Sequence, residues 1–451
     1  MEKRYFIHTY GCQMNLHESE KLAGMLESDG FVKADCAVSA DVIVFVTCCI
    51  RENAEQKVYG HIGELKAYKR ANPGVIIAVG GCMTQQSGAA QKLKEKFPFV
   101  DIIFGTHNLC GFMEMLRKKQ TVKKTLIEIT EDDSELESVP MTRTSFPNAW
   151  VNVIYGCDNF CTYCIVPYVR GRERSRTIPD VVAEVKKLVD EGYKEITLLG
   201  QNVNSYGNDL KKAAAKTGDV QAESDAGDFA DLLDAIGAEV KGEYRLRFMS
   251  SHPKDLTERL VSAVARNKNA CHLIHLPLQS GSNDVLKRMN RRYTREQYFE
   301  KVEMIRRIIP DCAISTDVMV GFPGETERDF EDTMELMERV GFSAAFMFVY
   351  SRRSGTPADK MPDQIDESVS KRRITEMVAA QNKRTAEYST GYEGKTVEIL
   401  CEDYDEKRGL YLGRDEYGRM GYFPSDKDEK GNFVKIKVSK VNGISLFGNK
   451  A

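Results

Sequence analysis

Three closely spaced cysteines constrain this chain more than any other feature. Cys157, Cys161 and Cys164 follow the spacing C-x3-C-x2-C within one short stretch. Four thiolates complete the ligand set of a 4Fe-4S cluster, so three leave one iron open. S-adenosylmethionine carries an amino and a carboxylate group that can chelate an open iron, and an electron passed to its sulfonium releases a 5′-deoxyadenosyl radical. The spacing therefore favours a radical-generating iron-sulfur site.

Zinc and a redox-active thiol pair are the alternatives, because C-x2-C serves both. A zinc site usually needs a fourth ligand nearby, and a thiol pair usually lies in a thioredoxin-like context. The aromatic neighbours Phe160 and Tyr163 and the lack of a second paired C-x2-C favour the cluster.

The composition is that of an ordinary protein of several domains. The 451 residues are 42% hydrophobic and 29% charged, and neither a membrane-spanning apolar run nor a signal peptide is evident. We therefore expect a cytoplasmic protein without a membrane partner. Twelve cysteines in a reducing compartment indicate metal or redox chemistry rather than disulfides. A net charge of -3 argues against a uniformly basic nucleic-acid binder, although local basic patches can still hold phosphates.

The first 120 residues have the pattern of an open parallel sheet with helices. Apolar runs at 5–9, 42–46 and 75–79 predict buried strands, and amphipathic stretches at 18–28 and 52–70 predict helices. Ligands of such sheets bind at the shared edge formed by the carboxyl ends of the strands.

A second set of cysteines follows these three strands. Cys12, Cys48 and Cys82 each come just after a strand, so the fold should bring them together. Gly11 and the pair 80–81 indicate tight turns that expose a ligand. Small cysteines also pack at strand ends, but three converging thiols favour a second cluster with an exchangeable iron.

An acidic connector at 121–147 separates this domain from the next. Strands then alternate with helices through residues 148–381, which predicts a parallel sheet of the barrel type with its chemistry at the carboxyl ends of the strands. The expected elements are a helix at 180–191 and strands at 195–199, 244–249, 272–278, 313–320 and 344–350. The segment 210–228 lacks periodicity, and we expect a surface loop there.

The last part, residues 382–451, has the pattern of a small all-β barrel. A charged helix at 367–388 precedes short strands bounded by Gly and Asp turns. The strands are expected at 396–401, 409–414, 420–423, 433–438 and 445–447. Such barrels bind oligonucleotides or pack as accessory domains, and the strands alone do not separate the two.

Several stretches together resemble the methylthiotransferases of the radical S-adenosylmethionine superfamily. Within that family, Thr9-Tyr-Gly-Cys-Gln-Met-Asn15, the Cys157 loop and Arg170-Gly-Arg-Glu-Arg-Ser-Arg176 resemble the branch that acts on isopentenylated adenosine in tRNA. Further similar stretches are 199–204, 250–253, 276–281, 315–317 and 320–325, so the match runs nearly end to end. The resemblance implies a partial (β/α) barrel of radical SAM type for the central domain and an RNA-binding TRAM domain for the terminal barrel.

One position departs from the family pattern. Val46 stands where the family usually has Asn, and the next thiol, Cys49, follows Cys48 directly. We assign Cys48 as the ligand because it follows Thr47, with Cys49 as the alternative.

The resemblance implies replacement of the hydrogen on carbon 2 of an adenine by a methylthio group. That carbon has no useful acidity, so a side-chain base is a poor route and we assign none. The family uses two equivalents of S-adenosylmethionine, one for methylation of sulfur on the auxiliary cluster and one for the radical. Expected partners are tRNA carrying N6-isopentenyladenosine, a low-potential electron donor and a sulfur or cluster-assembly donor.

Polar residues at strand ends are the expected holders of S-adenosylmethionine, although a buried structural hydrogen bond remains an alternative for Asp317. They are Gln201, Asn202, Ser250, Ser251, Gln279 and Asp317. Expected RNA contacts are the arginines after the cysteine loop and two cations of the terminal barrel, with internal ion pairs and solvated surface as their alternatives. They are Arg170, Arg172, Arg174, Arg176, Lys407 and Arg414.

Three other activities remain open. The related reaction on threonylcarbamoyladenosine in tRNA is the second candidate, and a ribosomal-protein aspartate, the substrate of another branch, fits the 9–15 stretch less well. A non-catalytic iron-sulfur protein that binds RNA is the alternative from a different class, but a scaffold has little need for two incomplete thiolate sets.

Overall fold

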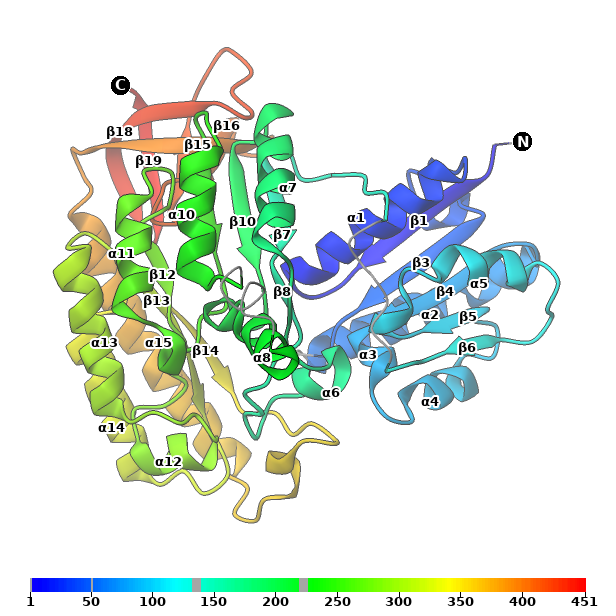
Figure 1. The fold of residues 1–451 in the computed structure, drawn as a ribbon, viewed down its shortest axis with the longest axis horizontal. Helices are drawn as coiled ribbons and strands as arrows, with labels where there is room; N and C mark the ends of the chain where they lie inside the picture. Colours follow the sequence, from blue (N-terminus) through cyan, green and yellow to red (C-terminus); the bar gives the residue numbers. More distant parts are fainter. Residues whose placement is uncertain (1, 50–51, 132–138, 219–225) are drawn as a thin grey trace.

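The computed structural model describes residues 2–49, 52–131, 139–218 and 226–451, which form three successive parts (Figure 1). The first is a parallel sheet in the order β2-β1-β3-β4-β5-β6. Its strands are β1 (Arg4–Thr9), β2 (Val32–Lys33), β3 (Val42–Thr47), β4 (Ile76–Gly81), β5 (Ile102–Phe104) and β6 (Leu126–Glu128). The three predicted strands are confirmed.

Helices cover both faces of this sheet, and β3 is buried at every position. Val42 and Val44 pack into one core, and Ile43 and Phe45 pack into the core on the opposite face. The helices are α1 (Gln13–Ser28), α2 (Glu52–Ala71), α3 (Cys82–Gln85), α4 (Ala89–Lys96) and α5 (Phe112–Lys119). Because β1 pairs with both β2 and β3, the strand order reverses there, and ligands of doubly wound sheets bind at such a switch point.

The central part is a partial barrel of six parallel strands with helices on its outer face (Figure 1). Its strands are β7 (Asn148–Asn152), β10 (Glu195–Leu199), β11 (Arg245–Phe248), β12 (Leu273–His275), β13 (Ala313–Val320) and β14 (Ala344–Val349). The main outer helices are α7 (Ile178–Asp190), α10 (Phe229–Glu239), α11 (Glu258–Arg266), α13 (Arg295–Ile308), α14 (Glu327–Val340) and α15 (Glu367–Thr390). A single bridge between Leu246 and Ala270 joins the two three-stranded halves.

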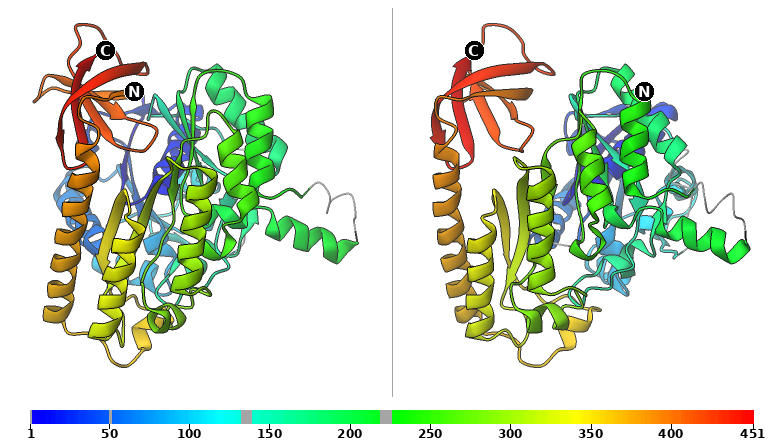
Figure 2. Two further views of the ribbon diagram at one scale, coloured as in Figure 1. Left: turned by 90° about the vertical axis from the view of Figure 1, so that its left-hand side faces the viewer. Right: turned by 60° about the vertical axis from the view of Figure 1, so that its left-hand side comes forward.

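Shorter elements carry the loops of this part. Strands β8 (Ile154–Tyr155) and β9 (Arg174–Ser175) pair antiparallel, and α6 (Val166–Arg170) and α12 (Asn283–Arg288) follow the functional loops. The expected surface loop at 210–228 is partly wrong, because helix α8 (Asn208–Thr217) occupies its first part and projects from the molecule (Figure 2). Good helix formers such as Ala213 and Lys216 outweigh the weak amphipathic pattern there. Residues 219–225 lie outside the described ranges.

The terminal part is a closed five-stranded barrel at the end of α15 (Figure 2). Its strands are β15 (Thr396–Asp405), β16 (Leu410–Arg414), β17 (Met420–Phe423), β18 (Phe433–Asn442) and β19 (Ser445–Lys450). It docks against the amino-terminal ends of the central strands, where the Arg245 guanidinium donates to the Arg414 carbonyl at 2.6 Å and Tyr417 donates to Asp311 at 2.7 Å. The carboxyl ends of those strands therefore lie away from it.

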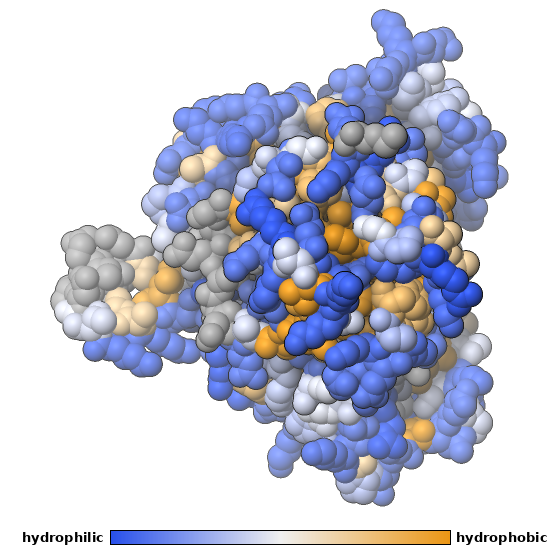
Figure 3. Space-filling view, turned by 90° about the vertical axis from the view of Figure 1, so that its right-hand side faces the viewer, coloured by the Kyte–Doolittle hydropathy of each residue, from blue (hydrophilic) through white to orange (hydrophobic). Residues whose placement is uncertain are grey.

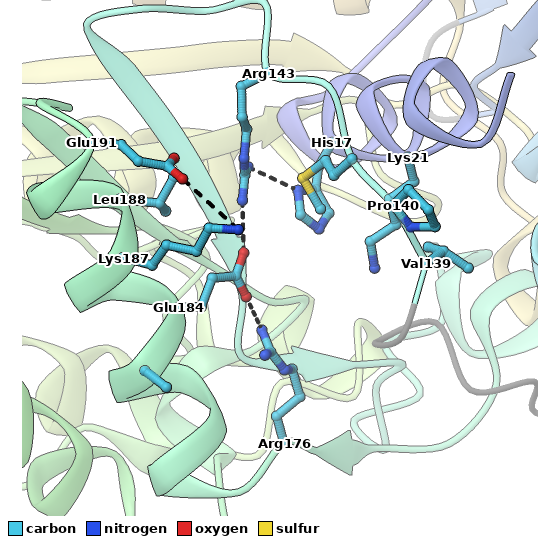
Figure 4. Close-up of a pocket in the computed structure, with 12 residues that line it drawn as sticks. His17, Lys21, Val139, Pro140, Arg143, Arg176, Glu184, Lys187, Leu188 and Glu191 are labelled. Atoms are coloured by element: carbon cyan, nitrogen blue, oxygen red, sulfur yellow. Dashed lines mark hydrogen bonds and ion pairs between the residues drawn. The ribbon is translucent and has the colours of Figure 1, made fainter. Parts of the chain in front are cut away.

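A connector seats the N-terminal domain against α7 (Figure 4). Arg143 donates to Glu20 at 3.2 Å, Glu184 at 2.6 Å and the Trp150 carbonyl at 2.6 Å, so one side chain joins α1, α7 and β7. A cavity of about 460 Å³ lies beside it.

Figure 3 shows the face that carries the N-terminal domain, which is mostly hydrophilic with hydrophobic side chains near its middle. None of the helices in the described ranges combines the length and apolar character needed to cross a bilayer.

Candidate functional site

The Cys157 loop is held by a segment more than a hundred residues later in the chain. Cys157 and Cys161 are buried, and Cys164 is partly buried. The Thr162 amide donates to the Met289 carbonyl at 3.1 Å, and the Asn290 side chain donates to the Phe160 carbonyl at 3.0 Å. Hydrogen bonds to the segment 288–291 thus hold the loop in place.

Two donors point at the sulfur atoms of this loop. The Asn159 side chain donates to Cys157 Sγ at 3.5 Å, and the Arg291 guanidinium donates to Cys161 Sγ at 3.4 Å. Burial raises the pKa of Cys157 to about 11 and that of Cys164 to about 12, so a metal must displace protons to bind there. Sequence reasoning missed Arg291 and Asn290, because no spacing pattern links residues 288–291 to the cysteines.

The second set of cysteines meets at the switch point of the N-terminal sheet. Cys12 follows β1, Cys48 follows β3 and Cys82 begins α3 after β4, and these three strands are neighbours. Gly11 has a φ of +108°, and a Cβ added there would lie 2.3 Å from Cys48 Cβ. The thiols of Cys49 and Cys82 share a hydrogen bond. Cys12, Cys48 and Cys82 therefore follow neighbouring strands at one edge of the sheet, and Cys49 lies beside Cys82.

Helix α6 joins the two sets of cysteines. It begins two residues after Cys164, and its five residues cover about 7.5 Å. Ile165 and Val169 pack directly against Cys49 and Cys82. One short helix therefore has the cysteines of the Cys157 loop before it and the N-terminal cysteines against its side.

Arg170, the last residue of α6, reaches into the N-terminal domain. Its guanidinium donates to Glu18 at 2.6 Å and to Asn15 at 3.0 Å, and all three side chains are buried. A hydrogen bond from Cys49 and the charge of Arg170 lower the pKa of Cys82 to about 7. Arg170 is thus part of the contact between the domains, not a free phosphate ligand.

The other predicted arginines divide between interior and surface. Arg176 is buried and pairs with Glu184 at 2.6 Å, so it serves the same connector as Arg143. Arg174 lies over the Tyr155 ring at 5.4 Å. The Arg172 side chain is 73% exposed and pairs with Asp158 at 3.4 Å. Two of the four arginines predicted to contact RNA, Arg170 and Arg176, therefore form buried ion pairs, which was the alternative given in the sequence analysis.

The predicted S-adenosylmethionine holders surround the carboxyl ends of the barrel strands. Gln201 donates to Met14 Sδ at 3.1 Å, which places it against α1. Asn202 donates to Asp255 at 2.7 Å, while its Oδ1 and the Ser251 hydroxyl are buried without a hydrogen-bond partner in the described chain. Unpartnered buried polar atoms are uncommon, so these two atoms fit a polar ligand.

Of the remaining three holders, Ser250 follows β11, Gln279 follows β12 and Asp317 lies on β13. Ser250 and Gln279 have φ values of +68° and +67°, a backbone conformation that is strained for residues other than glycine. Asp317 lies on β13 with its Oδ2 3.5 Å from His275 Nε2, and its side chain keeps 30% of its surface exposed. Asp317 is therefore not fully used by a structural hydrogen bond.

The two cations predicted on the terminal barrel are both near its surface. Lys407 is exposed, and Arg414 is partly exposed and pairs with Glu402 at 3.5 Å. The rings of Tyr422 and Phe447 stack at 4.9 Å, and Arg408 lies over Tyr422 at 5.2 Å. Sequence reasoning missed this aromatic pair.

The turn before Cys48 is held by an amide side chain from another element. Val46 is buried in β3, and the Asn15 side chain donates to the carbonyls of Tyr10 at 2.6 Å and Thr47 at 3.0 Å. The amide that secures the turn before Cys48 therefore comes from α1.

Across the described ranges, no three His, Cys, Asp or Glu side chains converge closely enough to hold a single metal ion. A 4Fe-4S cluster does not require that convergence, because its cysteines bind separate irons. The donor set of each triad is all thiol, which fits such a cluster.

Three family profiles match parts of the chain. The radical SAM superfamily matches residues 151–337, the "Uncharacterized protein family UPF0004" matches residues 4–105 and the TRAM domain matches residues 391–451. Among solved structures, the radical S-adenosylmethionine methyltransferase TsrM from Kitasatospora setae aligns with a TM-score of 0.55 at 12% identity, over 80% of this chain and 74% of that one. That likeness shows the fold alone. Fold and cysteine loop together define a radical SAM enzyme, which supports one 4Fe-4S cluster with S-adenosylmethionine.

Relatives that match nearly the whole chain show which family of radical SAM enzymes it belongs to. The protein named tRNA-2-methylthio-N(6)-dimethylallyladenosine synthase from Clostridium botulinum strain Langeland is 49% identical over 99% of this chain and 96% of its own length. Its namesake from Clostridium perfringens is 48% identical over 99% and 98%. The chain belongs to the family of tRNA-2-methylthio-N(6)-dimethylallyladenosine synthases.

The contact through Arg170 can be tested by Arg170→Gln, which leaves Glu18 buried without its cation. Removing one partner of a buried pair costs about 3–5 kcal/mol, and we expect that loss in the free energy of unfolding. The measurement is urea denaturation followed by the fluorescence of Trp150, the only tryptophan. Arg172→Gln is the matched control, because its exposed pair should contribute less than about 1 kcal/mol. Equal losses in the two variants would contradict the interdomain role.

Proposed function

We propose that this enzyme replaces the hydrogen on carbon 2 of N6-isopentenyladenosine, next to the tRNA anticodon, with a methylthio group. The relatives that cover 99% of the chain carry the name of this activity. The observation that carries the proposal is the pair of incomplete thiol sets beside one short helix, α6. Methylthiolation needs both a radical source and a sulfur carrier near one substrate atom, and this arrangement supplies a place for each.

Carbon 2 of an adenine loses its hydrogen poorly to a base, so no side chain is assigned as one. When bound, a cluster with an open iron supplies the reductive cleavage of S-adenosylmethionine. Cys157, Cys161 and Cys164 hold that cluster in this proposal, and the burial of Cys157 and Cys161 limits the access of water to it.

The second cluster is assigned to Cys12, Cys48 and Cys82, with Cys49 as the alternative to Cys48. The all-thiol donor set and the close contact of Gly11 with Cys48 support it. One equivalent of S-adenosylmethionine serves methylation of sulfur at this centre, and the other serves the radical.

S-adenosylmethionine is held at the carboxyl ends of the barrel strands. The buried oxygens of Asn202 and Ser251 suit its polar groups, and the half-exposed Asp317 suits ribose hydroxyls. Gln201, Ser250 and Gln279 complete the proposed set.

We assign the auxiliary centre to residues 1–120, the radical chemistry to 148–381 and RNA binding to the TRAM domain at 382–451, joined by the linker 121–147. Lys407, Arg414, Arg174 and the exposed Arg172 are the proposed phosphate contacts. The stacked Tyr422 and Phe447 offer a surface for bases. A low-potential electron donor and a sulfur or cluster-assembly donor complete the partners, and the tRNA substrate places the activity in the cytoplasm.

The activity itself is tested with reconstituted protein, dithionite, S-adenosylmethionine and tRNA that carries N6-isopentenyladenosine. We expect 5′-deoxyadenosine and the 2-methylthio nucleoside by mass spectrometry of digested tRNA. Substrate tRNA with threonylcarbamoyladenosine should give no methylthio product in the same assay. Product from that tRNA alone would support the second candidate, and absence of 5′-deoxyadenosine would support a non-catalytic RNA-binding protein.

The auxiliary centre is tested by Gly11→Ala against Gly30→Ala. Both glycines have positive φ, but the added Cβ meets Cys48 at 2.3 Å at position 11 and nothing within 4 Å at position 30. Because two 4Fe-4S clusters hold about eight irons, we expect Gly11→Ala to bind about four per chain and Gly30→Ala about eight. Iron counting and sulfide counting after anaerobic reconstitution measure this. Equal iron content in the two variants would count against a cluster at Cys48.

The RNA contacts are tested by combining Lys407→Ala with Arg414→Ala. Each lost phosphate contact lowers the slope of log K against log salt by about 0.9 for a duplex, so the double variant should lose about 1.8. The measurement is tRNA binding between low and physiological salt. Lys371→Ala is the control, because Lys371 is exposed on α15 and pairs with Glu367 outside the barrel. An unchanged slope in the double variant would remove both residues from the interface.

A further inference from the structure

Arg291 is buried beside the Cys157 loop, with 4% of its surface exposed. Its guanidinium donates to the Tyr293 hydroxyl at 3.1 Å, the Pro277 carbonyl at 3.0 Å and Cys161 Sγ at 3.4 Å. None of the Asp or Glu side chains in the described chain forms an ion pair with it. These neutral partners satisfy its hydrogen bonds but leave its positive charge without a counter-ion.

The other buried arginines of the described chain each pair with a carboxylate. Each of the six has a carboxylate within 2.6 to 3.6 Å. The pairs are Arg170 with Glu18, Arg176 with Glu184, Arg245 with Glu398, Arg247 with Glu195, Arg373 with Glu325, and Arg419 with Asp415. A buried charge is strongly disfavoured unless it is paired. The exception at Arg291 therefore indicates that its counter-ion is not a side-chain carboxylate.

A cluster bound by the Cys157 loop supplies that anion. Three thiolates around an oxidised 4Fe-4S core give a formal charge of -1, and one added electron makes it -2. We propose that Arg291 is a positioning residue that raises the reduction potential of this cluster by holding a fixed positive charge against Cys161. This inference rests on the assignment of Cys157, Cys161 and Cys164 in the proposed function.

The direction of the effect follows from electrostatics. A low-potential one-electron donor gives one electron to the cluster, and no bond breaks and no proton moves in this step. A nearby positive charge stabilises the more negative, reduced state more than the oxidised one, and the effect is strong where water is excluded. Hydrogen bonds to cluster sulfurs act in the same direction on the potential.

The N-terminal cysteines have a different charge environment. The guanidinium beside Cys82 belongs to Arg170, and Glu18 neutralises it at 2.6 Å. Arg353 also lies near these cysteines, and its guanidinium donates to the Cys49 carbonyl.

The test is a reductive titration followed by electron paramagnetic resonance, in the full chain with Cys12, Cys48 and Cys82 replaced by Ala so that one cluster gives the signal. In Arg291→Met, we expect the ratio of reduced to oxidised cluster at the midpoint potential of the parent to fall about tenfold, a shift of about 59 mV for a one-electron couple. Arg291→Lys keeps the charge and should stay within about threefold of the parent. Arg292→Met changes the same net charge at the next, exposed residue, where solvent screens it, and should stay within about twofold.

Three results would overturn the proposal: an unchanged potential in Arg291→Met, an equal shift in Arg292→Met, or weaker S-adenosylmethionine binding at unchanged potential. The last would assign Arg291 to the carboxylate of that ligand. If Arg291→Met fails to hold its irons, the comparison of Arg291→Gln with Arg291→Lys decides, because Gln keeps a donor without the charge. Equal potentials for that pair contradict the proposal, and a lower potential for Gln supports it. If the unsubstituted chain holds about four irons instead of eight, that result would refute only the auxiliary centre, and the titration would still decide Arg291.

Discussion

The contact between α6 and the edge of the N-terminal sheet determines whether this protein has one functional site or two separate ones. The cysteine loop precedes α6, and the N-terminal cysteines pack against its side. The Arg170–Glu18 pair closes the contact with opposite charges that are both buried. Because each charge would be costly without the other, the domains are held in one register. The relative position of the two thiol sets depends on this pair and on the apolar packing of Ile165 and Val169.

The fold follows closely from the sequence because its strands are nearly continuous apolar runs. The bounds of β10, β13 and β17 were predicted to the residue, and the other predicted strands differ at their ends. The segment 210–228 was predicted less well, because its weak amphipathic pattern hid the helix propensity that forms α8. A buried strand can be recognised in the sequence as an apolar run. A helix that projects from the molecule buries few side chains, so its sequence shows little apolar periodicity.

The sequence likewise predicted some residues of the candidate site and not others. The six cysteines were predicted from spacing and from strand ends, and in the structure Cys12, Cys48 and Cys82 follow neighbouring strands of the N-terminal sheet. The arginines were not predictable in this way, because a charged side chain near a motif can face solvent, a phosphate or a carboxylate far along the chain. Arg170 and Arg176 face Glu18 and Glu184, which lie in other elements. Arg291 gave no local signal at all, since its partner Cys161 is 130 residues earlier.

The placement of the TRAM domain bears on how such a site can handle a large substrate. The guanidinium groups of Arg245 and Arg247, on β11, donate to main-chain carbonyls of residues 414–416. The terminal barrel therefore covers the amino-terminal ends of the central strands. The carboxyl ends, with the thiols, Asn202 and Ser251, remain the part that a nucleobase can enter. A substrate bound at both places must be long enough to span the barrel, and a folded tRNA meets that requirement while a free nucleoside does not. Binding energy from the far end of such a substrate can then orient the reacting carbon without any additional contact at the chemistry.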